Sequence, residues 1–393
     1  MKKTVLMIIE HTSIPSDTIV WQDALTLNSD GFEVIIISPK SKLDYSIYEN
    51  KSNIKIFRHP RFFDGSSVFL YILEYLEALF WEAIYLIFVL IRYNFKIIYV
   101  DSPPDFIALW GIVSKYILKK KFVFKRDDIY PELYCVKYSK KKIIYRLLLM
   151  IEKIAHRTAD ISLVLNDSTK ELILSRVNIS KDRIKVIRFG PDIINFLPSK
   201  TNHFVKKNKY LIGYVGVLAQ QENIDGLLRI FETLLSLRKS FETELVIVGD
   251  GPEANQFISF AEIIGISKYV NFVGRKSWLD GSMMDILNKC DLFVCPDEKN
   301  DMNDRTTMSK VMEYMALCKP IVMYDLKENR ITAEDAGIYV DSGNELEFAK
   351  QINYLLENKS EREFIGMRGY QIFIEKWQWT HQKTKLIEVF NNL

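Results

Sequence analysis

The sequence predicts an α/β protein made of two consecutive Rossmann-like lobes, each with a parallel sheet. Short, nearly continuous apolar runs of strand length alternate with longer amphipathic stretches, which is typical of strands covered by helices on both faces. The length of 393 residues suits about two domains of ~100–200 residues each. The alternation breaks once, near Gly190 and Pro191, where the polar segment 198–208 reads as a linker. These observations place one lobe on each side of that segment.

The first lobe begins with a strand, a helix and a strand, and the Ser29–Gly31 turn ends that helix. Its strands are expected at Thr4–Ile9, Val34–Ser38, Ile97–Val100, Phe122–Phe124, Ile161–Leu165 and Lys185–Ile187. Its helices are expected at Thr18–Leu27, Val68–Tyr93, Ile107–Leu118, Ile143–Arg157 and Thr169–Arg176. A strand–helix–strand order of this kind predicts parallel pairing.

The second lobe repeats the same alternation with its own strands and helices. Strands are expected at Tyr210–Gly216, Glu244–Gly249, Val270–Val273, Leu292–Cys295, Ile321–Tyr324 and Ala336–Val340. Helices are expected at Asp225–Leu237, Glu253–Ile264, Met283–Asn288, after Thr307, and at Glu345–Leu356 and Glu361–Lys376. We therefore predict domains at 1–197 and 198–375, a final helix over 376–393, and a ligand cleft between the lobes.

Composition narrows the class of protein. The net charge of +3 gives no reason to expect a nucleic-acid-binding protein, but eleven basic and three acidic residues lie between Lys115 and Arg146. The four cysteines form no Cys-x-x-Cys motif and indicate free thiols in a reducing compartment. Glutamates interrupt the apolar stretch Val68–Ile91, so it does not supply the roughly 20 apolar residues of a membrane span.

The segment Pro296–Asp325 predicts a binding site for an anion. A polar loop leaves a buried strand and enters a helix, for which Thr306 and Thr307 are candidate N-caps. Apolar residues recur at helical spacing from Met308, and Lys310 and Glu313 are neighbours away from that stripe. The end of a parallel strand beside a helix N-terminus suits an anionic ligand. An exposed surface ion pair between the two side chains is the alternative.

Two glycine-containing turns follow strands of the second lobe. Gly213–Gly216 and Gly249–Gly251 allow the backbone to come close to a ligand, although plain tight turns explain them as well. The second turn lacks the third glycine of a dinucleotide-binding fingerprint, which argues against an NAD site.

Taken together, the motifs of the second lobe resemble those of glycosyltransferase family 4. The resemblance rests on the order and spacing of GYVG, VIVGDGP, VNFVG, DLFVCP and KVMEYMALCKPIV, and extends more loosely to DSPPD, DIYPEL and TADISLVLNDSTKEL. The loop NDMNDRTTMSK is similar to a branch found in bacterial surface-polysaccharide (O-antigen and capsule) gene clusters. The resemblance implies the GT-B fold and a retaining, metal-independent enzyme that uses a nucleotide sugar as co-substrate and no other cofactor.

The resemblance implies a donor site in the second lobe, with departures. Glu313 matches the glutamate that holds the donor ribose, but Arg305 stands where the family has a first glutamate. The family's phosphate-binding arginine and lysine would fall at Val217 and Glu222, so we infer that Arg305 and Lys310 take over the diphosphate. The remaining donor-binding candidates are Gly213, Gly216, Gly249, Gly251, Gly274, Arg275, Thr306 and Thr307.

In the first lobe the resemblance implies an acceptor-binding site. Asp128 and Glu132 match the branch, whereas Asp127 stands where a histidine is usual. We expect Asp127 and Asp128 to be catalytic, with Asp127 accepting the proton of the acceptor. Simple pairing with Lys125 and Arg126 is the alternative. His11, in the loop after the first strand, is an acceptor-side candidate, although a structural role is the more ordinary one for a single loop histidine.

These inferences predict a glycosyltransferase that moves a sugar from a UDP-linked donor to a hydroxyl of a growing, lipid-linked glycan, with retention. The final helix, 376–393, resembles the family's last helix, which returns to the first lobe. A cytoplasmic protein is expected, peripheral at the inner face of the cytoplasmic membrane, where the basic patch 115–146 and the adjoining apolar helices would contact lipid. The alternatives are a nucleotide-sugar epimerase of the same fold and a non-catalytic partner in a polysaccharide synthesis complex.

Overall fold

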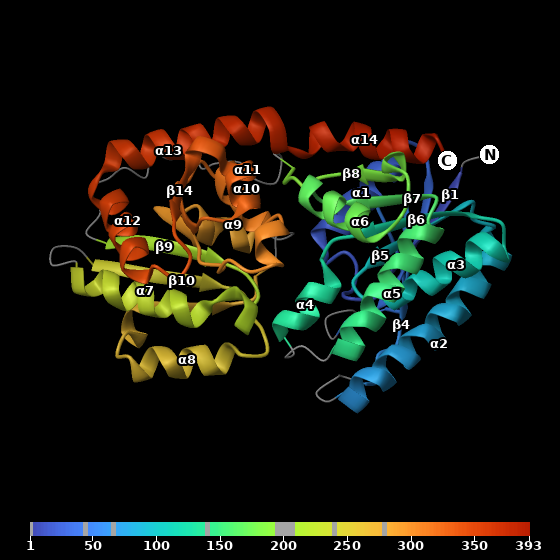
Figure 1. The fold of residues 1–393 in the computed structure, drawn as a ribbon, viewed down its shortest axis with the longest axis horizontal. Coiled ribbons are helices and arrows are strands. Elements are labelled where there is room, and N and C mark those ends of the chain that lie inside the picture. Colours follow the sequence, from blue (N-terminus) through green and yellow to red (C-terminus); the bar gives the residue numbers. More distant parts are fainter. Residues whose placement is uncertain are drawn as a thin grey trace. The chain divides into compact units, whose positions relative to one another are not determined.

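The computed structural model describes residues 3–41, 46–63, 68–137, 142–192, 209–237, 242–276 and 281–393. The chain divides into two compact units (Figure 1). The first comprises Met1–Arg188 together with Gln382–Leu393, and the second comprises Phe189–His381. The sequence suggested limits at 197 and 375. The predicted linker, 198–208, lies outside the described residues, and the predicted cleft stays a prediction.

The first unit is built on an eight-stranded sheet in the order β3-β4-β2-β1-β5-β6-β7-β8. Its strands are β1 (Thr4–Ile9), β2 (Glu33–Pro39), β3 (Tyr48–Lys51), β4 (Ile54–His59), β5 (Ile97–Ser102), β6 (Lys121–Arg126), β7 (Ile161–Val164) and β8 (Ile184–Val186). All neighbours are parallel except β3 and β4, which form an antiparallel edge pair. The parallel α/β prediction is confirmed, but β3 and β4 were not predicted, because charged residues interrupt their apolar pattern.

The helices of the first unit cover this sheet. They are α1 (Thr18–Ser29), α2 (Val68–Tyr93), α3 (Ala108–Tyr116), α4 (Tyr130–Lys137), α5 (Lys142–Thr158), α6 (Asp167–Arg176) and the C-terminal α14 (Trp379–Asn391). The bounds of α2 agree with the prediction. Phe390 of α14 is fully buried and packs edge-on against Phe32 and beside Tyr99, so the last residues of the chain complete the core of the first unit.

The second unit contains a six-stranded, fully parallel sheet in the order β11-β10-β9-β12-β13-β14. Its strands are β9 (Lys209–Val215), β10 (Glu242–Val248), β11 (Val270–Gly274), β12 (Leu292–Cys295), β13 (Ile321–Tyr324) and β14 (Gly337–Val340). Its helices are α7 (Ile224–Leu237), α8 (Ala254–Ile263), α9 (Ser282–Leu287), α10 (Ser309–Ala316), α11 (Lys327–Ala333), α12 (Glu345–Glu357) and α13 (Lys359–Ile372).

Each sheet has one point at which the chain changes the direction in which it adds strands. In the first unit β2 and β4 lie on one side of β1, and β5 to β8 lie on the other. In the second unit β10 and β11 lie on one side of β9, and β12 to β14 lie on the other. Connections leave such neighbours toward opposite faces, which opens a crevice at the carboxyl ends of the strands where ligands bind in α/β proteins. We therefore expect ligand sites beside β1 and β5 in the first unit and beside β9 and β12 in the second.

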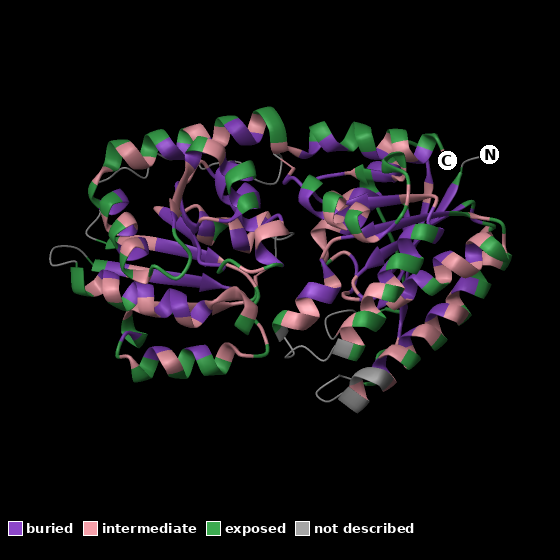
Figure 2. Ribbon diagram, in the orientation of Figure 1, coloured by how far each residue is buried: buried purple, intermediate pink, exposed green. Residues whose placement is uncertain are grey.

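Burial follows the sheets. The central strands are largely purple in Figure 2, and β1, β5, β12 and β13 are buried along their whole length, as nearly continuous apolar runs require. Among the described residues, no helix combines the length and the apolar character needed to cross a membrane. The prediction that Val68–Ile91 does not span is therefore confirmed.

Candidate active site

A cluster of largely buried charged side chains lies at the carboxyl ends of β1, β5 and β6 in the first unit. His11 follows β1, Asp101 lies near the end of β5, and Asp127 directly follows β6. Strand pairing places Ile9 beside Asp101 and Asp101 beside Lys125. The register of three neighbouring strands therefore brings these functional groups together at one edge of the sheet.

His11 bridges two carboxylates in this cluster. Its Nε2 lies 2.6 Å from Asp17 Oδ2, and its Nδ1 lies 3.7 Å from Asp101 Oδ2. Asp17 is held in place as the N-cap of α1, where its Oδ1 accepts from the backbone N–H of Ile19 and Val20. Burial lowers the pKa of His11, but the hydrogen bond to Asp17 and the nearby carboxylates outweigh it and raise that pKa to about 9. His11 is therefore an imidazolium at neutral pH.

Lys125 is the second cation of the cluster. Its Nζ donates to Asp23 Oδ2 at 2.7 Å and lies 3.5 Å from Asp127 Oδ1 and 3.9 Å from Asp101 Oδ1. Burial raises the pKa of Asp127 against the opposing charge of Lys125, to about 6. Burial and the charge of Asp127 also raise the pKa of Asp101 well above its usual range. The predicted pairing of Asp127 with Lys125 is present, and it leaves Asp127 with a pKa suited to exchange protons near neutrality.

The other predicted residues of the first unit have structural contacts. Arg126 is fully buried and pairs with Asp105 and Glu152 rather than with the carboxylate of Asp128, whose backbone oxygen accepts from Arg126 Nε at 3.0 Å. Glu132 is buried and forms an ion pair with Arg176. Glu132 therefore stabilises the packing of α4 against α6 in this structure.

In the second unit the close approach of two loops requires glycine at positions 249 and 251. A Cβ on Gly249, where φ is +152°, would lie 1.9 Å from the Gly216 oxygen, and a Cβ on Gly251 would lie 2.3 Å from the Leu218 oxygen. A Cβ on Gly213 would instead overlap the Phe293 ring. Backbone hydrogen bonds from Gly216 to Val248 and from Leu218 to Asp250 hold the loops together. The glycines are therefore needed for the backbone conformation of these loops. This agrees with the alternative interpretation, in which they belong to tight turns.

Lys310 of α10 lies in the crevice between β9 and β12, but its charge is already balanced. Its Nζ donates to Glu222 at 2.7 Å and to both oxygens of Asp297 at 3.0 and 3.2 Å. It also lies over the ring of Tyr214, 4.9 Å from the centroid. Burial lowers the pKa of Lys310, but the two carboxylates raise it well above its usual range. The alternative of an exposed surface pair with Glu313 is wrong, because both side chains are buried.

Glu313, one turn further along α10, is a buried carboxylate of a different kind. Its exposure is 8%, and within the described residues no hydrogen bond or ion pair is recorded for its carboxylate. Burial raises its pKa to about 7, partly opposed by Lys310. A buried carboxylate costs stability unless it is paired, so Glu313 has the properties of a group that is satisfied by a ligand.

The remaining predicted donor residues lie just before α10 and at the end of β11. Arg305 is partly exposed and donates to the backbone oxygen of Asp301 at 2.7 Å. The prediction that Thr306 or Thr307 caps the helix is wrong: Met308 occupies the N-cap position, and the threonine hydroxyls bond to Met302 and Glu328. Gly274 ends β11 with φ of +76° and Arg275 follows it, exposed.

Several members of these two clusters were not identified from the sequence. They are Asp17, Asp23 and Asp101 in the first unit and Tyr214, Glu222 and Asp297 in the second. Asp101 and Asp297 each stand at or just after the end of a buried strand, and that position was the available signal. Asp23 lies within α1. Only the tertiary structure brings its carboxylate against Tyr99 and Lys125.

Two α/β units, each with a parallel sheet and a polar cluster at its switch point, define a protein of the GT-B class. Sucrose-phosphate synthase from Thermosynechococcus elongatus has the same fold, with a TM-score of 0.77 at 14% identity over 100% of this chain and 99% of that one. Anabaena Alr3699/HepE, solved in complex with UDP and glucose, gives a TM-score of 0.75 at 15% identity over the full length of both chains. These likenesses establish the fold.

Sequence comparison establishes the family. Residues 18–193 match the family described as Glycosyltransferase Family 4, and residues 197–372 match that described as Glycosyl transferases group 1. The capsular polysaccharide biosynthesis glycosyltransferase CapM of Staphylococcus aureus is 23% identical over 236 residues, which span 57% of this chain and 60% of that protein. The chain belongs to the family 4-like glycosyltransferases of the GT-B fold.

The raised pKa of Glu313 predicts a pH-dependent effect of removing its charge. Because folding raises this pKa from 4.5 to about 7, the folded chain holds the proton more tightly than the unfolded chain, and ionisation costs stability. The cost is absent well below pH 4.5 and complete above pH 7. We expect Glu313→Gln to stabilise the protein by about 1–3 kcal/mol near pH 8 and by nothing near pH 4.

Thermal melts of wild type and Glu313→Gln at the two pH values measure this difference. The exposed Glu363 provides the control, because Glu363→Gln should not shift the melting temperature at either pH. Equal melting temperatures for wild type and Glu313→Gln near pH 8 would contradict the raised pKa.

Proposed function

We propose that this protein transfers a sugar from a UDP-linked donor to a hydroxyl of a growing, lipid-linked glycan, with retention of configuration, in surface polysaccharide synthesis. Its membership of the family 4-like glycosyltransferases supports sugar transfer. HepE, of the same fold, was solved with UDP and with UDP-glucose, and the relative CapM is described as a capsular polysaccharide enzyme. Retention of configuration rests on the family resemblance.

Glu313 is the observation that carries the proposal. It is buried, it has no recorded partner within the described residues, and it stands on α10 beside the switch point of the second sheet. Two vicinal hydroxyls of a ribose can donate hydrogen bonds to one carboxylate, and such charge-assisted bonds are stronger than neutral ones. Binding a nucleotide would satisfy the ionised form of Glu313 and lower its pKa.

The diphosphate needs positive charge or N–H donors. We assign the diphosphate to Arg305, whose guanidinium is partly exposed, and to Lys310, which also pairs with Glu222 and Asp297. The first turn of α10 adds the partial positive charge of a helix N-terminus. In this arrangement two carboxylates hold Lys310, so its contribution to the diphosphate is smaller than that of an unpaired lysine.

The transfer step requires a group that takes the proton of the acceptor hydroxyl. The hydroxyl oxygen bonds to the anomeric carbon while the bond from that carbon to the diphosphate oxygen breaks, and UDP leaves with the electron pair. We assign the proton to Asp127, because its pKa of about 6 keeps it ionised at neutral pH yet able to accept. The contacts of His11 with Asp101 and of Lys125 with Asp127 hold the charged cluster in place around it. The departing phosphate oxygen is the alternative acceptor of the proton.

Donor binding tests the assignment of Glu313, Arg305 and Lys310. Isothermal titration calorimetry with UDP should show about 10–100-fold weaker binding for Glu313→Gln, from the loss of charge-assisted hydrogen bonds. Arg305→Ala and Lys310→Ala should each weaken binding by about tenfold, and Lys350→Ala, on the exposed face of α12, should leave it unchanged. Unchanged affinity in both Arg305→Ala and Lys310→Ala would show that these cations do not serve the diphosphate.

Calorimetry and a product test with the donor alone separate the two alternative functions. A non-catalytic partner that had lost its donor site would bind no UDP or UDP-sugar in the wild-type protein. An epimerase would convert a UDP-sugar with no acceptor present, which mass spectrometry coupled to chromatography of the sugar product detects.

Asp127 gives a prediction for the rate of transfer. We expect the wild-type kcat to rise with pH through about 6 and to level off above it, because only ionised Asp127 accepts a proton. Asp127→Asn should lower kcat by about 10²–10⁴-fold and remove the rise, with UDP affinity unchanged. The exposed Asp182 provides a control, Asp182→Asn, with wild-type kinetics. A full rate in Asp127→Asn would assign the proton to the departing phosphate.

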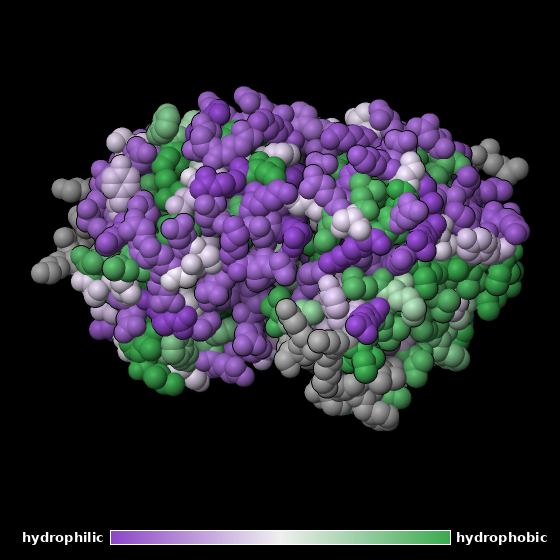
Figure 3. Space-filling model, in the orientation of Figure 1, coloured by the Kyte–Doolittle hydropathy of each residue, from purple (hydrophilic) through white to green (hydrophobic). Residues whose placement is uncertain are grey.

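We further propose that the first unit contacts an anionic membrane surface through α2. Six large apolar side chains form one exposed stripe along α2: Leu76, Phe80, Ile84, Ile87, Phe88 and Ile91, with exposures of 42–81%. Figure 3 shows hydrophobic atoms gathered over this part of the first unit. At the C-terminal end of the stripe lies a basic cluster: Arg92, Lys96, Lys119, Lys120 and Lys121.

An apolar stripe beside basic side chains suits the interface of an anionic bilayer. The helix α5 carries a second exposed stripe: Ile143, Leu147, Met150 and Ile154. Part of the predicted basic patch, residues 138–141, lies outside the described residues. The cluster at the end of α2 therefore carries the proposal, which would place the protein peripherally at the inner face of the cytoplasmic membrane, beside a lipid-linked acceptor.

Vesicle co-sedimentation tests the membrane contact. The protein should sediment with phosphatidylcholine vesicles that contain phosphatidylglycerol, less so at high salt, and not with phosphatidylcholine alone. The double change Ile87→Asp and Ile91→Asp should abolish sedimentation, because both charges would have to enter the interface. Ile263→Asp, at an equally exposed isoleucine of the second unit, should retain it. Loss of binding in Ile263→Asp alone would contradict the assignment to α2.

A further inference from the structure

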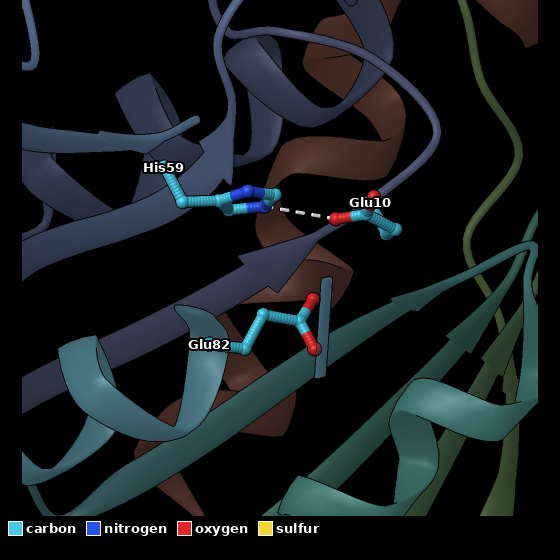
Figure 4. A group of neighbouring side chains, drawn as sticks. All are labelled: Glu10, His59 and Glu82. Atoms are coloured by element: carbon cyan, nitrogen blue, oxygen red, sulfur yellow. Dashed lines mark hydrogen bonds and ion pairs between the residues drawn. The ribbon is translucent and has the colours of Figure 1, made fainter. Parts of the chain in front are cut away.

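Three side chains that could bind a metal ion meet in the interior of the first unit, apart from the charged cluster around His11. Glu10 directly follows β1, His59 ends β4, and Glu82 lies in the middle of α2 (Figure 4). One possible ligand atom from each lies within 4.8 Å of the others. All three are buried, with exposures of 4%, 1% and 0%. Residues far apart in the sequence therefore place two carboxylates and an imidazole at one enclosed point.

The hydrogen bonds of His59 leave one of its nitrogens facing a carboxylate. Its Nδ1 lies 2.9 Å from the carbonyl oxygen of Pro60. A carbonyl only accepts, so Nδ1 carries the hydrogen, and the neutral ring presents the lone pair of Nε2. That lone pair points at Glu10 Oε2, 2.9 Å away. This contact is an ion pair when Nε2 also carries a hydrogen, and a cation bound between Nε2 and Oε2 would take the place of that hydrogen.

Glu82 makes the imbalance larger. Its Oε2 accepts from Trp110 Nε1 at 2.6 Å, but its Oε1 is buried without a hydrogen-bond partner. No lysine or arginine among the described residues forms a recorded ion pair with Glu10 or Glu82. Within the described residues, the recorded side-chain partners are His59 for Glu10 and Trp110 for Glu82.

We propose that Glu10, His59 and Glu82 bind one divalent cation, of which Zn²⁺ is the best match. Imidazole nitrogen and carboxylate oxygen are both ordinary zinc ligands, at ~2.0–2.2 Å. Two carboxylates and a dication are neutral together, which removes the cost of burying the charges. Pro60 and Trp110 supply the outer hydrogen bonds that typically orient a metal-binding imidazole and carboxylate. The three ligand atoms lie within 4.8 Å of one another, so binding a common ion would draw them closer together.

The ion would have a structural role that is separate from the donor diphosphate. It ties the middle of α2 to the loops that follow β1 and β4. Glu10 is the residue before His11, so the ion would fix the start of the loop that carries His11 into the charged cluster. The family resemblance implies that no metal ion binds the donor diphosphate. That expectation does not apply to this separate site.

Metal analysis of the full-length protein tests the proposal. Protein purified without an affinity tag or chelator should contain about one zinc per chain by inductively coupled plasma mass spectrometry. A chelator should lower the melting temperature by several degrees, and added Zn²⁺ should restore it. Glu82→Gln should weaken Zn²⁺ binding at least ~100-fold. Mn²⁺ in place of Zn²⁺ in the purified protein would support the same site with a different dication.

A matched control exists in the same unit. Glu152 is also buried with one unpartnered oxygen, Oε1, but its other oxygen is paired with Arg126, outside this cluster. Glu152→Gln should therefore retain wild-type metal content, which separates loss of a ligand from general loss of stability. The proposal is wrong if wild-type protein holds no stoichiometric dication and its melting temperature does not respond to Zn²⁺ or chelator. It is equally wrong if Glu82→Gln keeps the metal.

Discussion

Two buried lysines, one in each unit, balance the carboxylates at the switch points of the two sheets. Lys125 contacts Asp23, Asp101 and Asp127, and Lys310 contacts Glu222 and Asp297. In both clusters the carboxylates outnumber the cation, and burying them would be too costly without it. Burial is the main cause of the raised pKa of Asp127, and the neighbouring carboxylates Asp17 and Asp23 add to it. Glu10, His59 and Glu82 are also buried, and within the described residues no lysine contact is recorded for them.

In the second unit, the family resemblance implies a phosphate-binding lysine at the position of Glu222. In this structure Lys310 of α10 pairs with Glu222. The positive charge thus remains within the same crevice, but it comes from α10 rather than from the loop after β9. Arg305 in place of a glutamate adds a second cation at the entrance of the same helix. The two changes together keep a positive charge at the helix end while they alter which side chain presents it.

The sequence was sufficient for the architecture because strands buried on both faces are continuous apolar runs, as in Thr4–Ile9 and Leu292–Cys295. The sequence was insufficient for β4, because a lysine, an arginine and a histidine interrupt the apolar pattern of this strand near the sheet edge. At the site, the family resemblance proposed Glu313 and Asp127, and the structure gives both carboxylates a raised pKa. Tertiary packing alone decided that Lys310 would meet Glu222 and Asp297, because those partners lie 88 and 13 residues away. The capping prediction failed because the threonine hydroxyls found other acceptors.

The C-terminal helix has a consequence for the order in which the protein folds. Phe390 lies in the core of the first unit, against Phe32 and Tyr99. During synthesis the ribosome releases residues 1–188 long before it adds Gln382–Leu393, and chains fold as they emerge. The second unit is contiguous and can close as soon as it is made, whereas the first must keep part of its apolar surface uncovered until the last residues arrive. The unit that is translated first is therefore the last to be completed.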